Sequence, residues 1–333
     1  MKELVVISGK GGTGKTSIAA AFASLAQKAV VADCDVDAAD LHLVLSPTII
    51  QRSDFSGGKK ASIHTDKCIG CGACLSHCRF GAVVKDDYAN GLASSMLKSD
   101  CENCDYCERS CSIRNHVIIR DMQQAMGLAG PTIFRIDPFA CEGCKVCVEF
   151  CPVNAIDFKQ TINGQWFISD TRFGPMVHAQ LGIAEANSGK LVTLIRREAK
   201  RIAEEQNKDL LIIDGSPGIG CPVIASITAS DLVLVVTEPT LSGKHDLERV
   251  AQLTANFGIK TLVCINKADI NPQMTEQISE DACKHGLKVV GKIPYDDAFT
   301  KAQIMKATLI EYTGGDIAEK IKAMWREVIY ELG

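Results

Sequence analysis

The stretch "GKGGTGKTS", residues 9–17, decides the fold. It satisfies the pattern G-x-x-x-x-G-K-[ST], and it lies between an apolar run and a helix-like segment. In that context the backbone N–H groups of a glycine-rich loop point at phosphates, and the positive end of the following helix adds to the attraction. We expect Lys15 to neutralise the outer phosphates and the Thr16 hydroxyl to reach Mg²⁺. The predicted nucleotide-binding residues are Gly9, Lys10, Gly11, Gly12, Thr13, Gly14, Lys15, Thr16 and Ser17.

Short apolar runs alternate with amphipathic segments on either side of a cysteine-rich middle. The runs are rich in Val, Ile and Leu without alternation, which is typical of strands buried on both faces of a parallel sheet: 3–9, 29–35, 209–215, 231–239 and 260–269. Helix-like segments lie at 15–28, 193–206 and 244–258. This alternation predicts a doubly wound, mostly parallel α/β domain made of residues 1–56 and 160–333. Residues 57–159 are expected to form a second domain inserted into one of its connections.

Composition narrows the class of protein. The chain has 333 residues, 46% of them apolar and 23% charged, which suits a pair of globular domains. The net charge of −4 and the lack of a long basic run argue against nucleic acid as a partner. The start of the chain reads as a strand of a cytoplasmic protein and not as a signal peptide. No apolar run approaches 20 residues, and the apolar stripe of residues 316–333 is expected to dock on the sheet, so a membrane partner is not expected.

An additional lysine, Lys10, lies inside the loop. With it, "KGGTGKT" resembles the deviant Walker A loop of the MinD/ParA class of ATPases, which includes the nitrogenase iron protein. The resemblance implies binding and hydrolysis of ATP to ADP with Mg²⁺. It also implies a nucleotide-dependent homodimer in which Lys10 completes the nucleotide site of the other subunit.

Three further stretches fit the same class. "VVADCDVDAAD" ends a strand with Asp33, Asp35 and Asp37, and the resemblance makes Asp35 the switch I acid that orients the attacking water or a metal-bound water. "LLIIDGSPGIG" ends a strand at Asp214, which is expected to hold Mg²⁺ through water in a movable switch II segment. "CINKAD" resembles a base-recognition segment in which Asn266 reads adenine beside Lys267. The expected catalytic residues are thus Lys10, Lys15, Asp35 and Asp214, and the expected Mg²⁺ contacts are Thr16, Asp35 and Asp214.

Twelve of the 16 cysteines fall in three runs, which indicates metal or redox chemistry. Two runs have the spacing C-x₂-C-x₂-C-x₃-C of bacterial ferredoxins: Cys68, Cys71, Cys74, Cys78 and Cys141, Cys144, Cys147, Cys151. In two-cluster ferredoxins the fourth cysteine of each run binds the cluster of the other run. We therefore expect one 4Fe-4S cluster on Cys68, Cys71, Cys74 and Cys151, and a second on Cys141, Cys144, Cys147 and Cys78, in a ferredoxin-like α+β domain.

A third run with the same spacing lies between these two. It consists of Cys101, Cys104, Cys107 and Cys111, within a further insertion at about 86–132. A third 4Fe-4S cluster is the simplest occupant and Zn²⁺ is a competitor, because no other run remains to share a ligand. The third run could also pair with one of its neighbours. Outside the runs, Cys221 could bridge a dimer through a shared cluster or serve as a small core residue.

The combination suggests three functions. The first is a nucleotide-gated dimer that couples ATP to electron transfer toward a redox or metallocofactor protein. The second is a scaffold or carrier that delivers an iron–sulfur or other metal cluster during cofactor assembly. The third is a MinD-like positioning ATPase whose ferredoxin insert is a structural unit or a redox sensor.

Overall fold

The computed structural model describes residues 1–85, 133–182 and 188–333. These residues divide into two compact units. The first contains residues 1–57 and 162–333, and the second contains residues 58–161. Each unit is described by itself below. The insertion expected at about 86–132, with Cys101, Cys104, Cys107 and Cys111, lies outside the described residues.

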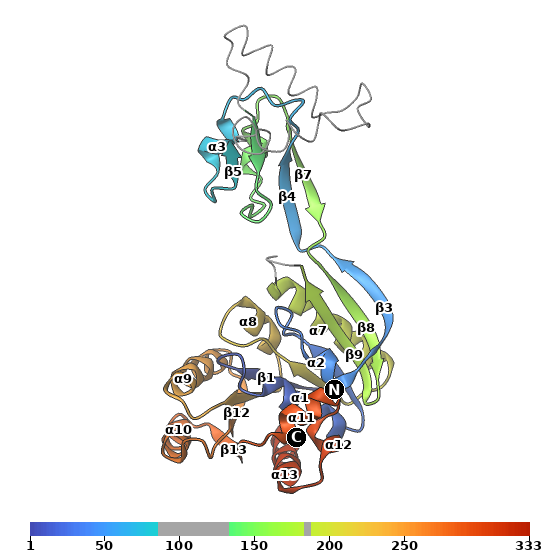
Figure 1. Ribbon diagram of the computed structural model, residues 1–333, viewed down its shortest axis with the longest axis vertical. Coiled ribbons are helices and arrows are strands. Elements are labelled where there is room, and N and C mark those ends of the chain that lie inside the picture. Colours follow the sequence, from blue (N-terminus) through green and yellow to red (C-terminus); the bar gives the residue numbers. More distant parts are fainter. Residues whose placement is uncertain (86–132, 183–187) are drawn as a thin grey trace, which may run out of the picture. The chain divides into compact units, whose positions relative to one another are not determined.

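A nine-stranded sheet runs through the described part of the first unit (Figure 1). Its order is β13-β12-β11-β1-β10-β2-β9-β8-β3. All neighbours from β13 to β9 pair in parallel, which confirms the predicted mostly parallel α/β sheet. The parallel strands are β1 (Lys2–Ser8), β2 (Ala29–Asp33), β9 (Gly174–Leu181), β10 (Leu210–Asp214), β11 (Leu232–Thr237), β12 (Lys260–Asn266) and β13 (Lys288–Ile293).

Helices cover both faces of this sheet, because successive side chains of a strand point to opposite faces. In β1, Val5 and Ile7 belong to a core under α7 (Ser188–Glu205), α8 (Cys221–Ile227), α9 (Leu241–Asn256) and α10 (Pro272–Lys284). Leu4 and Val6 belong to the opposite core, under α1 (Lys15–Leu25), α11 (Ala298–Ile304), α12 (Leu309–Tyr312) and α13 (Asp316–Leu332). A smaller cluster on β2 and β9 is covered by α1 and α2 (Leu41–Leu45). The sheet is therefore buried on both sides, as its apolar runs predict.

The C-terminal helix α13 packs on the sheet. Its apolar stripe enters the core through Ile317, Ile321, Met324, Val328 and Leu332, all of them buried. The docking expected from the sequence is the observed arrangement. Among residues 1–85, 133–182 and 188–333, no helix combines the length and the apolar character that crossing a membrane requires.

One side of the sheet ends in antiparallel strands that the sequence patterns do not predict. Strands β3 (Thr48–Phe55) and β8 (Gly164–Thr171) pair with each other, and β8 pairs with β9. On the outer strand β3 only Phe55 is buried, so its sequence lacks the continuous apolar run of a central strand. The chain leaves the first unit after β3 and returns into β8, so the second unit is inserted between two paired strands.

His178 on β9 provides a test of this region. Its Nε2 lies 2.8 Å from the Ser169 hydroxyl, its ring stacks on Phe167, and burial followed by the nearby His42 lowers its pKa to about 4. Between about pH 6.5 and pH 4, His178 is therefore protonated in the unfolded chain but neutral in the folded chain. The free energy of unfolding that is present above about pH 6.5 is lost as the pH falls toward 4, by at most about 1.4 kcal/mol per pH unit.

We expect His178→Gln to flatten this acid-side loss in urea unfolding followed by tryptophan fluorescence. The exposed His285→Gln is the matched control and is expected to follow the wild type. Trp166 and Trp325, the two tryptophans of the chain, both belong to the first unit and report on its unfolding. Parallel pH profiles for wild type and His178→Gln would contradict the assignment.

The second unit is small and built around its cysteines. In its described part, β4 (Gly58–Ile63) pairs antiparallel with β7 (Ile156–Thr161), and β5 (Val83–Lys85) pairs antiparallel with β6 (Phe134–Ile136). The short helices α3 (Ala73–His77) and α6 (Val146–Glu149) each follow the first cysteines of a run. Its core is a cluster of the buried residues Ala61, Cys74, Val83, Phe134 and Ile156, and other cysteines pack against them.

Candidate functional site

The loop between β1 and α1 lies at the carboxyl end of the sheet, beside the point where chain order reverses around β1. Gly14 caps α1 with φ 89°, a left-handed conformation that favours glycine. A side chain there would also collide with Asn266, whose Nδ2 would lie 2.4 Å from an added Cβ. Asn266 is the last residue of β12 and donates from Nδ2 to the Thr13 carbonyl at 2.8 Å. The glycine therefore permits both the turn and the close approach of Asn266.

Lys15 is the centre of a buried ionic cluster. Its Nζ lies 2.6 Å from Asp214 Oδ1 at the end of β10, 3.3 Å from Asp35 Oδ2 after β2, and 3.4 Å from the Thr16 hydroxyl. Burial lowers the pKa of Lys15, but Asp214 and Asp35 outweigh it, so the pKa is raised and the ammonium stays charged. Three parallel strands thus bring together Lys15, Asp35 and Asp214, which lie far apart in sequence.

Carboxylates outnumber cations in this cluster. Asp33 is fully buried beside Asp35 and Asp214, and burial followed by repulsion from Asp214 raises its pKa well above the usual range. Burial also raises the pKa of Asp35. Within the described residues, Asp33 Oδ2 and Asp214 Oδ2 have no hydrogen-bond partner. Unpartnered buried carboxylate oxygens are costly, and a hard cation with oxygen ligands would relieve them. The donor set therefore fits Mg²⁺.

The Lys10 side chain contacts residues of its own subunit. Its Nζ is 2.6 Å from Glu238 Oε1 and 2.9 Å from the Ser242 hydroxyl. Lys267 Nζ lies 3.1 Å from Glu238 Oε2 and donates to the Gly12 carbonyl at 3.1 Å. Both lysines predicted at the nucleotide therefore share one carboxylate.

Other predicted residues of the loop differ in what they contact. Gly11 and Gly12 are exposed and open to solvent, whereas Gly9 packs so closely on α9 that an added Cβ would lie 2.2 Å from the Cβ of Asp246. The Ser17 hydroxyl accepts from Gln303 at 2.9 Å. The motifs do not single out Glu238. It directly follows the buried strand β11, and Asp214 is the last residue of the buried strand β10, so a carboxylate at the end of an apolar run is the signal common to both.

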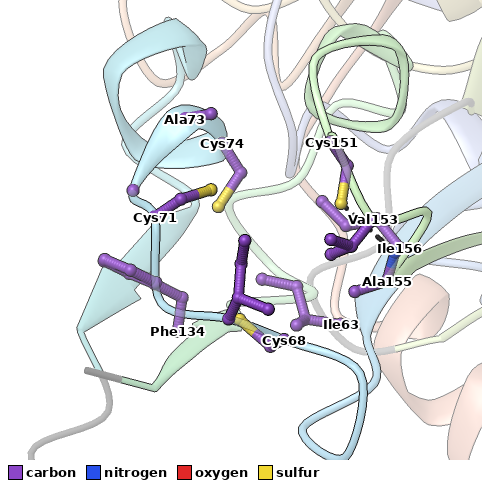
Figure 2. Close-up of a pocket in the computed structure, with 12 residues that line it drawn as sticks. Ile63, Cys68, Cys71, Ala73, Cys74, Phe134, Cys151, Val153, Ala155 and Ile156 are labelled. Carbon is purple, nitrogen blue, oxygen red and sulfur yellow. Dashed lines mark hydrogen bonds between the residues drawn. The ribbon is translucent and has the colours of Figure 1, made fainter. Parts of the chain in front are cut away.

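The described cysteines of the second unit fall into two sets of four. One hollow is lined by Cys68, Cys71, Cys74 and Cys151, together with apolar side chains that include Ile63, Phe134 and Ile156 (Figure 2). Another hollow is lined by Cys78, Cys141, Cys144 and Cys147. Each hollow thus combines three cysteines of one run with the last cysteine of the other.

Thiols in these hollows are crowded. Burial, followed by repulsion from the neighbouring Cys141, Cys144, Cys74 and Cys78, raises the pKa of Cys147 to about 11. The Cys151 sulfur accepts the Ala155 backbone N–H at 3.2 Å. Four thiolates so placed repel one another unless a positively charged centre lies among them, so the donor chemistry fits a metal cluster.

The spacing that a single metal ion requires differs from the spacing that a cluster requires. Among the residues that the structure describes, no group of three or more His, Cys, Asp or Glu side chains is gathered tightly enough to hold one ion. A zinc ion with bonds of about 2.3 Å would require its sulfurs to lie within about 4 Å of one another. The larger 4Fe-4S cluster takes one thiolate per iron and holds the sulfurs further apart.

Cys221 begins α8 and is exposed, so it is not a core residue.

Comparison with known proteins decides the family. The CbiA family, described as the CobQ/CobB/MinD/ParA nucleotide binding domain, matches residues 4–309. The chain belongs to this family. It is therefore a P-loop nucleotide-binding protein, and its phosphate loop and the carboxylates after β2 and β10 lie where the fold places its ligand site.

Relatives of this CobQ/CobB/MinD/ParA protein occur in Methanocaldococcus jannaschii. The chain is similar to the uncharacterized protein MJ0578, with 27% identity over 98% of this chain and 96% of the relative. It is also similar to the uncharacterized ATP-binding protein MJ0823, with 30% identity over 34% of this chain and 43% of the relative.

Two solved structures show the same fold. The cell division ATPase MinD of Pyrococcus furiosus has a TM-score of 0.52 at 15% identity, with 100% of this chain and 99% of that chain covered. The septum site-determining protein MinD of Pyrococcus horikoshii, complexed with Mg-ADP, has a TM-score of 0.51 at 13% identity, with 98% and 95% covered. These likenesses support the MinD/ParA type of P-loop fold.

Proposed function

We propose that this family member is an ATP-hydrolysing iron–sulfur protein. In this proposal a nucleotide-dependent homodimer couples ATP binding and hydrolysis to electron transfer toward a redox or metallocofactor protein. The observation that carries the proposal is the presence, in one chain, of a phosphate loop and two hollows that each gather four cysteines from both runs. This interleaved grouping is the one that two-cluster ferredoxins use.

The nucleotide half of the proposal rests on the buried cluster. Lys15 would stabilise negative charge on the outer phosphates, and Thr16 and Asp214 would hold Mg²⁺, whose chemistry is to neutralise the transferred phosphoryl group. Asp35 contacts the same lysine and would orient the attacking water. Dimerisation would bring Lys10 of one subunit to the nucleotide of the other.

The redox half rests on the cysteines. Cys68, Cys71, Cys74 and Cys151 would hold one 4Fe-4S cluster, and Cys141, Cys144, Cys147 and Cys78 a second. Such clusters supply reversible storage of one electron each. The chain's own contribution is an apolar wall and backbone N–H groups such as that of Ala155, which donate to sulfur and favour the reduced state. A third cluster, or Zn²⁺, at Cys101, Cys104, Cys107 and Cys111 belongs to the proposal on sequence alone.

The test is anaerobic purification with counting of iron, sulfide and zinc, followed by redox titration with and without Mg-ATP. We expect about eight irons from the two described cages, rising to about twelve if the middle run also holds a cluster. Electron paramagnetic resonance should show midpoint potentials that shift when Mg-ATP is added, because nucleotide binding changes the dimer to which the clusters are attached. Unchanged potentials and unchanged subunit association with Mg-ATP would overturn the proposed coupling.

A cluster scaffold or carrier is the second candidate. Cys71 and Cys144 are exposed, one in each set, which would favour release of a cluster to a client protein. Holo-protein incubated with an apo-acceptor and ATP would then lose iron to the acceptor in step with hydrolysis. An electron carrier would retain its iron through many turnovers.

The likeness to the MinD structures favours a third candidate, a positioning ATPase with a structural or redox-sensing insert. Such a protein would localise or polymerise with ATP. Its ATPase activity would not respond to a low-potential reductant such as dithionite.

A further inference from the structure

Lys10 is held by the segment that connects β11 to α9 and by the first turn of α9. Three acceptors surround its Nζ: Glu238 Oε1 at 2.6 Å, the Ser242 hydroxyl at 2.9 Å and the Thr240 hydroxyl at 3.4 Å. An ammonium group has three donors, so these contacts occupy its full donor capacity. A lysine in this position has no proton left to offer to the nucleotide of another subunit.

The segment that holds Lys10 is fixed in place. Thr240 caps α9 by accepting the Gly243 N–H at 3.0 Å, and the Thr240 N–H donates to the Glu238 carbonyl at 2.8 Å. Gly243 packs so closely that an added Cβ would lie 2.3 Å from the Glu238 carbonyl oxygen. A capped, tightly turned helix start therefore presents the Glu238 carboxylate and the two hydroxyls as a preformed receptor for an ammonium group.

Glu238 does not depend on Lys10 alone. Its other oxygen, Oε2, lies 3.1 Å from Lys267 Nζ. Burial raises the pKa of Glu238, but hydrogen bonds from Lys10 and Lys267 outweigh it, so the pKa is lowered and the carboxylate stays ionised. If Lys10 leaves, Lys267 still neutralises the carboxylate, so no unpaired charge remains behind. Lys10 can therefore move away at modest cost.

We propose that Glu238 is a latch that keeps Lys10 on its own subunit until nucleotide is bound. The latch rests on the proposed nucleotide-dependent dimer, in which Lys10 reaches the phosphates of the partner's nucleotide. The phosphates of a nucleotide carry more negative charge than one carboxylate, so they can displace Glu238 as the acceptor for Lys10. Those phosphates come within reach of Lys10 only when a partner subunit with bound nucleotide approaches. Glu238 is thus a positioning residue that opposes premature dimerisation, and it acts through Lys10.

The first test measures dimerisation against ATP concentration by analytical ultracentrifugation, with a slowly hydrolysed ATP analogue. We expect Glu238→Gln to lower the concentration for half-maximal dimer by about three- to tenfold, the effect of losing one charge-assisted contact. Ser242→Ala, which removes a contact to Lys10 without touching Lys267, should act in the same direction but less. In a Lys10→Ala background, Glu238→Gln should bring no gain. An unchanged or raised concentration for Glu238→Gln would overturn the latch.

The second test measures how strongly Glu238 holds Lys10 in the nucleotide-free protein, where no dimer is required. Competitive labelling of nucleotide-free protein with acetic anhydride, followed by mass spectrometry, measures the reactivity of each lysine. We expect Glu238→Gln to raise labelling of Lys10 at least about threefold and to leave the exposed Lys28 unchanged as the internal reference. If the wild type stays monomeric with nucleotide but this change is seen, the Glu238–Lys10 contact stands, while the proposed dimer falls and the role of the latch in dimerisation falls with it. Equal labelling of Lys10 in both proteins would overturn the latch.

Discussion

Lys15→Met is expected to abolish ATP hydrolysis and to destabilise the first unit. Loss of the ammonium that would face the outer phosphates should lower the hydrolysis rate by about a thousandfold or more. The same change leaves Asp214 and Asp35 without the cation that they contact at 2.6 and 3.3 Å. Removing one partner from a buried ion pair costs about 3–5 kcal/mol, because the remaining charge stays buried. Phosphate release and urea unfolding followed by tryptophan fluorescence measure the two effects.

Lys10→Met is the matched control for this experiment. The Lys10 side chain is 33% exposed, so the loss of its pairing should change the stability of the nucleotide-free protein by no more than about 1 kcal/mol. It should still bind nucleotide as a monomer but fail to form the nucleotide-dependent dimer. Normal stability in Lys15→Met would contradict the buried cluster, and normal hydrolysis would remove Lys15 from the catalytic residues.

Paired cysteine variants are expected to remove either one cluster or both, according to which two residues are changed. Cys68 and Cys151 line the same hollow, so Cys68→Ala with Cys151→Ala should cost about four irons. Cys141 lines the other hollow, so Cys141→Ala with Cys151→Ala should cost about eight. Iron counting and the absorbance of the reduced and oxidised protein measure the loss.

The opposite ordering is the result that would contradict interleaving. If each run held its own cluster, the Cys141 and Cys151 pair would lose one cluster and the Cys68 and Cys151 pair would lose both. Cys221→Ala is the control, since Cys221 lies in the first unit and should leave the iron of an isolated subunit unchanged. If the Cys221→Ala dimer instead contained less iron than the wild-type dimer, a cluster that bridges the two subunits through Cys221 would be indicated.

The central part of the fold could be predicted because a strand that is buried on both faces of the sheet has a continuous apolar sequence. Runs such as that of β11 (Leu232–Thr237) contain only buried residues, and a phosphate loop follows a strand of the same kind. The antiparallel strands lack such a continuous apolar run. On β3, Ile49 and Ile50 are 47% and 70% exposed, so its apolar residues do not mark a core face.

The site could be predicted in its residue types but not in its side-chain partners. A carboxylate at the end of a parallel strand must lie at the sheet's carboxyl edge, which is why Asp214 could be named in advance. After β2 the same rule points to Asp33, Asp35 and Asp37 together, and only the family resemblance singled out Asp35. Which acceptor takes Lys10, and whether Asn266 faces the loop or a ligand, depends on rotamers and on chain segments more than 200 residues away. Asn266 is seen donating to the Thr13 carbonyl, while its Oδ1 has no partner among the described residues and stays a predicted contact for adenine.

The insertion between two paired strands also favours one order of assembly over the other. Phe55 pairs with Gly164 in the first unit, and Gly58 pairs with Thr161 in the second. If the second unit folds first, it brings β3 and β8 together and shortens the chain that must be closed from about a hundred residues to a few. Since each doubling of loop length costs about 0.6 kcal/mol in entropy, this saves on the order of 2 kcal/mol. Newly made chains supplied with iron and sulfide should therefore complete the edge of the large sheet sooner than chains that lack them.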